Sequence, residues 1–154
     1  MRRATPEDDR FINALGSTCA RSSISLIRQV SESVVALSFA HLMMFCRERP
    51  GTIDLIAEVD GERAGFLILL TDIPDDVTQE EQAFVAFMAV AEPVRREGVG
   101  KALMRAAETE ARRLGLPHLS LMVSADNHAA RALYAAEGLV EERLLMTKAI
   151  GGQA

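Results

Sequence analysis

The chain has 154 residues, 49% hydrophobic and 25% charged, a composition typical of one soluble globular domain. Its 17 basic and 22 acidic residues give a formal net charge of −5, which argues against DNA or tRNA as the main partner. Cys19 and Cys46 are too few for a zinc cluster or a disulfide framework, and they indicate a reduced, cytoplasmic setting. The most apolar run, residues 33–46, contains His41 and is too short to span a bilayer.

The first half of the chain predicts a strand, two helices and a hairpin. A short N-terminal strand precedes a helix that Thr5 caps, with a proline and three acids in its first turn. A second helical stretch covers about residues 24–47, although its apolar period is blurred. The dipeptide Asp60-Gly61 lies between two apolar runs and indicates a tight turn, so we expect an antiparallel hairpin over residues 53–70.

The second half alternates strands and helices. Residues 83–90 predict a buried strand, and the amphipathic helix that follows ends at Gly115. A strand at 118–123 and a short helix at 127–137 come next, and residues 139–150 supply one last strand or a cramped pair. This order predicts an α/β fold with one clear crossover connection.

Residues 94–103, VRREGVGKAL, combine positive charge with two glycines where a strand gives way to a helix. Six basic and three acidic residues between 95 and 113 give a local charge of +3. The first turn of a helix has free N–H groups and the positive end of the helix dipole, and glycine lets an anion approach the backbone. A pyrophosphate site and a plain turn with solvated arginines explain the stretch about equally well. A Walker motif does not fit, because it needs glycine where the chain has Arg95 and serine or threonine where it has Ala102. The dinucleotide-binding motif does not fit either, because it needs a third glycine where the chain has Leu103.

What remains is R-x-x-G-x-G at Arg95, Gly98 and Gly100, and with it the chain resembles the GNAT superfamily of N-acetyltransferases. The resemblance is close over residues 53–148, where the hairpin, the central strand and the stretch LSLMVSADNHAARALYAAEGL also match. It implies an α/β (α+β) GNAT fold. We therefore expect a central mixed, mostly antiparallel twisted sheet of 6–7 strands, about four flanking helices and splayed parallel central strands. One departure is Arg96, which replaces a frequent glycine.

The resemblance also implies that acetyl-CoA binds as co-substrate, without a metal. Backbone amides of the loop would hold the pyrophosphate, and the edge of the central strand would pair with the pantetheine arm. Asn127 would bond the arm, although a helix N-cap explains this residue at least as well. The implied cofactor-binding residues are Met88, Ala89, Val90, Arg95, Arg96, Glu97, Gly98, Val99, Gly100, Lys101, Ala102, Asn127 and Tyr134.

Tyr134 is the only tyrosine and stands where the family has its general acid, seven residues after Asn127. In that role it would donate a proton to the departing CoA thiolate. Core packing with the hydroxyl at the surface is the alternative. Transfer from a phenol to this thiolate is uphill by about 2 kcal/mol, so a positioned hydroxyl would act by stabilising the developing charge.

The sequence identifies no general base for the amine. Met122 stands where related N-terminal acetyltransferases of ribosomal proteins often carry a glutamate, which argues against a ribosomal-protein substrate. A base acting through water is an option. Five side chains are also candidates, although each is better explained as a solvated surface group: His41, Asp54, Glu58, Glu80 and Glu81. Three apolar residues fit the core better than an acceptor pocket: Met43, Met44 and Phe45.

These residues predict an N-acetyltransferase that transfers the acetyl group directly to a primary amine of a small molecule or a protein. The alternative is a catalytically inactive acyl-CoA-binding regulatory module. We expect one domain over residues 1–150, a flexible tail at 151–154, and no contact with membranes or nucleic acid. The short ending after Gly138 and the apolar second helix predict a homodimer.

Overall fold

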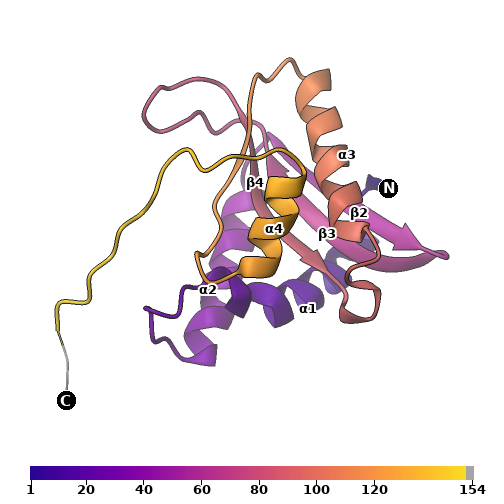
Figure 1. The fold of residues 1–154 in the computed structure, drawn as a ribbon. Coiled ribbons are helices and arrows are strands. Elements are labelled where there is room, and N and C mark those ends of the chain that lie inside the picture. Colours follow the sequence, from indigo (N-terminus) through magenta and orange to yellow (C-terminus); the bar gives the residue numbers. More distant parts are fainter. Residues whose placement is uncertain (152–154) are drawn as a thin grey trace.

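The computed structural model describes residues 1–151, which form one sheet with helices on both faces (Figure 1). The strands, in the order in which they lie side by side, are β1 (Arg2–Arg3), β2 (Thr52–Val59), β3 (Glu62–Leu70), β4 (Ala83–Val90) and β5 (Leu119–Leu121). The helices are α1 (Asp9–Cys19), α2 (Glu32–Arg47), α3 (Val99–Arg113) and α4 (His128–Ala136), with 3₁₀ turns η1 (Pro6–Asp8), η2 (Ala20–Ser23) and η3 (Glu92–Val94). The expected tail at 151–154 lies outside the described residues, except for Gly151.

The predicted hairpin is confirmed. The φ angles of Asp60 and Gly61 are 51° and 82°, so both central residues have the left-handed conformation that a tight two-residue turn requires. This turn sets β2 and β3 in antiparallel register, with Asp54 opposite Ile68. β1 pairs antiparallel with β2, and β3 with β4, so the one parallel pairing in the described part of the chain joins β4 to β5.

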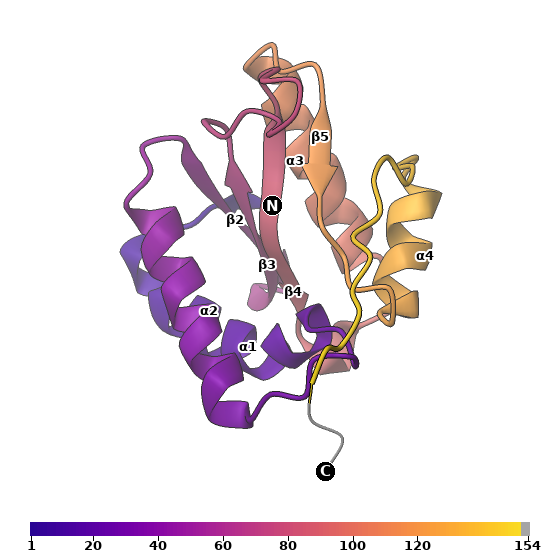
Figure 2. The same ribbon diagram turned by 90° about the vertical axis from the view of Figure 1, so that its left-hand side faces the viewer.

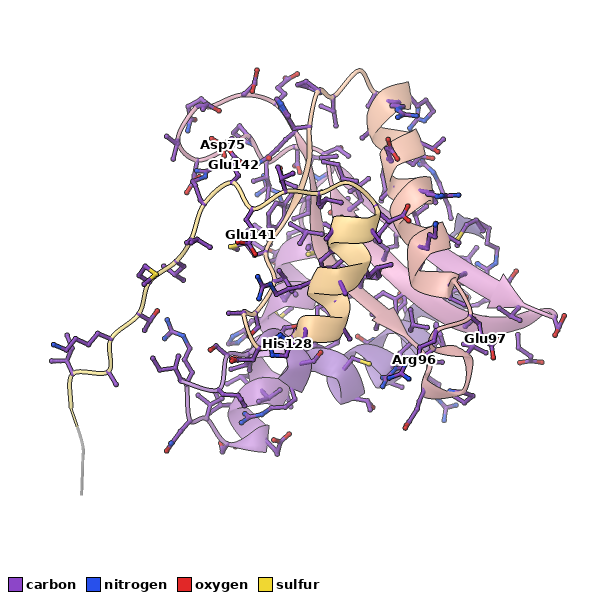
Figure 3. The ribbon with its side chains drawn as sticks, in the orientation of Figure 1. Asp75, Arg96, Glu97, His128, Glu141 and Glu142 are labelled. Carbon is purple, nitrogen blue, oxygen red and sulfur yellow. The ribbon has the colours of Figure 1, made fainter. Side chains whose placement is uncertain are left out.

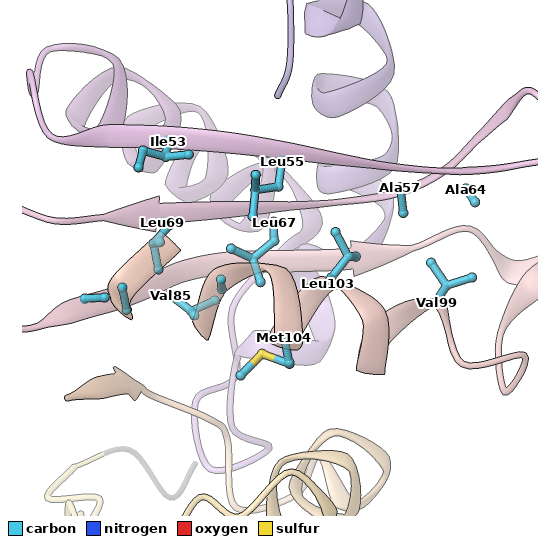
Figure 4. Packing of buried hydrophobic residues seen from close by; sticks show 13 residues of the cluster. Ile53, Leu55, Ala57, Ala64, Leu67, Leu69, Val85, Val99, Leu103 and Met104 are labelled. Carbon is cyan, nitrogen blue, oxygen red and sulfur yellow. The ribbon is translucent and has the colours of Figure 1, made fainter. Parts of the chain in front are cut away.

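Side chains that alternate along the strands give the sheet two buried faces, each with its own core. α1 and α2 cover one face, where Phe39 of α2 packs on Phe87, which stacks on Phe66. α3 covers the opposite face, and α4 lies beside it (Figure 2). The core under α3 includes the residues drawn in Figure 4, among them Leu55, Leu67, Leu69, Val85, Leu103 and Met104.

The parallel strands β4 and β5 separate after a short contact. They pair over only three residues each, Ala83–Val85 with Leu119–Leu121. Beyond this point the chain after β5 leads away to α4, so residues 86–90 have no strand neighbour on that side (Figure 2). The expected splay of two parallel strands is therefore confirmed, and it positions the candidate site.

The expected closing strand is wrong. Residues 139–150 form no strand, so the sheet has five strands rather than 6–7. A strand is stable only where a neighbour takes up its backbone hydrogen bonds. This segment is held by side chains instead, through ion pairs of Arg131 with Glu141 and of Arg143 with Asp75. The α/β class, the mostly antiparallel mixed sheet and the four α-helices agree with the prediction.

The second helix begins later than expected. α2 starts at Glu32 rather than near residue 24, because the Ser31 hydroxyl accepts a hydrogen bond from the Val34 amide and caps the helix there. The several serines between residues 16 and 33 hide this cap in the sequence. Among the helices described, none combines the length and apolar character needed to cross a membrane.

Candidate active site

The loop between β4 and α3 ends in a helix start without a side-chain cap. Gly98 precedes α3 with φ 86°, which glycine adopts freely, and Arg96 has φ 67°, a conformation that explains why glycine suits its position. Within residues 1–151, no backbone carbonyl accepts a hydrogen bond from the amides of residues 96–101. These free N–H groups lie at the positive end of the helix dipole, an arrangement suited to an anion.

Two loop residues differ in detail from the expectation. The amide of Ala102 donates to the Gly98 carbonyl at 2.9 Å and closes the first helical turn, so it is not available to a ligand. The side chain of Arg95 donates through Nε to the Val90 carbonyl at 3.1 Å. Arg95 therefore ties the loop to the end of β4.

Helix α4 lies against the first turns of α3. A Cβ at Gly100 would lie 3.0 Å from Cδ2 of Leu133, so this glycine permits the close approach of the two helices. Glu137, at the end of α4, pairs with Lys101 at 3.3 Å and with Arg105 at 3.1 Å. The side chain of Lys101 is thus engaged in fixing α4. Figure 3 shows Arg96 and Glu97 at the start of α3 and His128 at the start of α4, on the same side of the molecule.

A cleft of about 330 Å³ occupies the region where β4 and β5 separate. Residues 85–88 of β4 form one wall, and residues 121–124 form the opposite wall. Helix α4 contributes Tyr134, and the α1–α2 side contributes apolar and hydroxyl side chains. Its position beside the unpaired edge of β4 makes the cleft accessible to an extended ligand that pairs with a strand.

The three strand residues expected beside the pantetheine arm have different side-chain environments. Met88 lines the cleft, Ala89 is buried in the core under α1 and α2, and Val90 packs on the α3 side. Their backbone pairs with β3 on one side and has no strand on the other.

Tyr134 lines the cleft and packs at the same time. Its half-buried ring contacts the core under α3, as the packing alternative predicted. Burial raises the pKa of its phenol. Packing fixes the ring without removing the side chain from the cleft.

Asn127 caps α4 and also reaches across the cleft. Its Oδ1 accepts a hydrogen bond from an amide of the first helical turn at 3.2 Å, and its Nδ2 donates to the Ser22 carbonyl at 3.3 Å. The adjacent Asp126 accepts bonds from the Leu26 amide and the Ser25 hydroxyl, both at 2.8 Å, and these bonds lower the pKa of Asp126. The start of α4 is thereby tied to the segment between α1 and α2.

Residues 26–138 match the model of the Acetyltransferase (GNAT) family. The chain belongs to this family. An L-2,4-diaminobutyric acid acetyltransferase from Nocardia farcinica is 38% identical over 101 residues, which are 64% of this chain and 48% of that protein. The chain spans about half the length of the curated relatives it matches.

Solved structures share the GNAT fold. A structure from Pyrococcus furiosus, named as an acetyl transferase, superposes with a TM-score of 0.79 at 23% identity, over 94% of this chain and 95% of that one. The aminoglycoside N-acetyltransferase AAC(6')-Iy in complex with CoA gives a TM-score of 0.67 at 16% identity, over 97% of this chain and 98% of that one. At these identities the likeness concerns the fold alone.

The five candidate bases lie away from the cleft of this GNAT chain. Asp54 and Glu58 are on β2, His41 is on the exposed side of α2, and Glu80 and Glu81 precede β4. None of the five is among the described residues that line the cleft. Within residues 1–151 no three His, Cys, Asp or Glu side chains group in a way that could hold a metal ion.

The apolar residues of α2 divide between core and surface. Met43 is buried in the core, as the better of the two interpretations predicted. Met44 and Phe45 are 59% and 46% exposed, and they line neither the core nor the cleft. Ser38, which sequence reasoning did not single out, does line the cleft. The signal that marks it is its polarity within the apolar run of residues 33–46.

Proposed function

We propose that this chain is an N-acetyltransferase that transfers the acetyl group of acetyl-CoA directly to a primary amine of a small molecule or a protein. The observation that carries the proposal is that the free amides of residues 96–101 and the cleft lined by Tyr134 adjoin the same end of β4. Membership of the GNAT family and the CoA bound by the related aminoglycoside enzyme support it. No observation favours the inactive acyl-CoA-binding alternative.

In this proposal the CoA pyrophosphate accepts hydrogen bonds from the amides of residues 96–101. The pantetheine arm lies along residues 88–90, whose outer edge has no strand neighbour, as an added strand would. Arg95 keeps the loop beside β4, and Lys101 contributes its amide, because its ammonium group pairs with Glu137. Asn127 reaches the arm from the opposite wall of the cleft.

The transfer itself needs one bond formed and one broken. The neutral amine nitrogen attacks the acetyl carbonyl carbon, the new C–N bond forms and the C–S bond breaks. The departing thiolate takes a proton from the Tyr134 hydroxyl, and the proton lost by the amine passes through water and restores the phenol. Burial raises the pKa of Tyr134, and the same apolar surroundings would raise that of a bound thiol, so the two groups shift in the same direction.

We also propose that two copies associate. Large apolar side chains remain exposed on α2 and on the C-terminal segment, including Leu37 at 56%, Met44 at 59%, Leu145 at 86% and Ile150 at 92%. Patches of this kind mark protein contacts, and a second copy of the chain would cover them. Analytical ultracentrifugation should show a dimer, and a monomer at high micromolar concentration would contradict this part of the proposal.

The activity is tested by following thiol release from acetyl-CoA with a panel of amines, which includes diamino acids, polyamines, aminoglycosides and short peptides. We expect at least one amine to give free CoA and an acetylated product of matching amount by mass spectrometry. Calorimetry with CoA is the companion measurement. If CoA binds but no amine in the panel is acetylated, the result would favour the inactive acyl-CoA-binding module. If CoA does not bind, the whole proposal is contradicted.

A further inference from the structure

A second cavity, of about 400 Å³, lies at the opposite end of the sheet from the cleft. It is open to solvent and is lined by the chain after β1, the start of α1, the end of α2 and the start of β2. Strands β2 and β3 separate it from β4, so it is not part of the candidate active site. Its charged side chains include Asp54 from β2, Asp9 from α1 and Arg47 from α2.

Asp54 has an unusual environment for a carboxylate. Its Oδ1 is buried, and no group in residues 1–151 donates a hydrogen bond to it. The contrast with Asp8 is clear, because the carboxylate of Asp8 accepts bonds from Arg2 and Arg63 and from the Thr5 amide. Burial raises the pKa of Asp54. A desolvated carboxylate without a donor lowers the stability of the fold, so this one calls for an explanation beyond packing.

Two cations line the cavity, Arg3 and Arg47, and within the described residues neither forms an ion pair with Asp54. Arg3 pairs with Glu110 instead. The Nη2 of Arg47 donates to Asp9 at 2.6 Å. A guanidinium carries five N–H donors, and this is the one hydrogen bond that Arg47 donates to the described protein. The cavity therefore places a carboxylate with one buried oxygen, unpaired among the described residues, beside an arginine side chain that is 42% exposed and whose remaining donors are free for a ligand.

We propose that this cavity binds a small α-amino acid, with the ligand ammonium group on Asp54 and the ligand carboxylate on Arg47. A zwitterion satisfies both side chains at once, and an amine or a carboxylate alone satisfies one of them. Asp54, considered from the sequence as a catalytic base, is in this assignment a ligand-binding residue. The binding site is separate from the cleft, so the proposal does not depend on acetyl transfer.

The test compares three probes in the absence of acetyl-CoA: L-alanine, propylamine and propionate. In amide-resolved NMR titrations we expect L-alanine to shift signals of Ala4 and Thr52, which line the cavity, and to leave Ser22 and Ser124 of the cleft unchanged. Propylamine and propionate should each bind roughly tenfold or more weakly, because each loses one charged contact. Shifts confined to the cleft, or none at millimolar L-alanine, would overturn the proposal.

Variants then test the assigned contacts. Asp54→Asn and Arg47→Gln should each weaken L-alanine binding roughly tenfold or more. Asp60→Asn, the same substitution in the exposed β2–β3 turn, is the matched control and should bind as wild type does. Asp54→Asn should melt at the same or a higher temperature than the unliganded wild type, since it removes a desolvated charge. Binding by Asp54→Asn within about twofold of wild type would show that Asp54 does not hold the ligand ammonium group, and it would overturn the proposal.

Discussion

Helices α3 and α4 border the same cleft, but their first turns are built in opposite ways. At α4 the Asn127 side chain accepts a hydrogen bond from the first turn, so one of the free amides is satisfied by the protein itself. At α3 the preceding residue is Gly98, which has no side chain, and the amides of residues 96–101 find no backbone acceptor in residues 1–151. A helix start that is capped by a side chain, here called closed, stabilises the fold. A helix start without such a cap, here called open, leaves its amides available to a ligand. In the proposed enzyme α3 binds the co-substrate, and α4 carries the reacting group.

The largest effect is expected from a substitution that removes the reacting hydroxyl group from α4. Tyr134→Phe keeps the ring that packs against the core under α3, so stability and CoA affinity should change little. Loss of a positioned proton donor should lower kcat by roughly 10²–10⁴-fold, with a much smaller change in KM for acetyl-CoA. Steady-state kinetics with the acceptor found in the screen measure both constants. Turnover within a factor of about three of wild type, with chemistry limiting, would remove this role from Tyr134.

The next largest effect is expected from a substitution at the uncapped start of α3. Gly98→Asp adds a negative charge where the pyrophosphate is proposed to lie, and a Cβ at Gly98 meets no atom within 4 Å. CoA affinity measured by calorimetry should fall roughly tenfold or more. Gly98→Asn is the matched control, because asparagine has the same shape, tolerates a positive φ and carries no charge. Equal losses in the two variants would mean that backbone strain, and not charge, is responsible.

The smallest effect is expected from a substitution that removes the side-chain cap at the start of α4. Asn127→Ala removes the cap and the bond to the Ser22 carbonyl, and the free energy of unfolding should fall by about 1 kcal/mol. Asn127→Ser keeps an oxygen for the cap and loses the donor to Ser22 without adding a charge, so it should retain most of the stability. Urea denaturation measures both variants. An alanine variant as stable as wild type would show that α4 does not depend on its cap.

Local signals in the sequence predicted much of the fold. The Asp60-Gly61 turn depends on φ angles of two adjacent residues, and the start of α3 on glycine spacing, so both can be inferred without knowledge of distant contacts. The failed prediction is the closing strand at residues 139–150, whose apolar side chains fit a strand pattern. A strand also needs a free edge beside it, and that condition is not written in the segment itself.

The sequence predicted the part of the candidate site that consists of backbone amides. It did not predict the part that depends on side-chain contacts between residues far apart in the chain. The loop amides follow from the position of a helix start. The bonds of Asp126 to Leu26 and Asn127 to Ser22 join residues about a hundred positions apart, and nothing in either segment indicates its partner. The ion pairs of Glu137 with Lys101 and Arg105 could not be predicted for the same reason, since all three residues resemble ordinary surface charges in the sequence.

The separation of β4 and β5 has a consequence for the lifetime of the folded protein. Because only three residue pairs join these strands, the β5–α4 part is connected to the rest of the sheet by few backbone hydrogen bonds. A molecule that occupies the cleft and contacts both walls adds to the stability of the whole fold by mass action, about 2.7 kcal/mol when its concentration is 100 times its Kd. In such a protein the supply of co-substrate governs resistance to proteolysis as well as the rate of reaction. Depletion of acetyl-CoA would then shorten the survival of the protein itself.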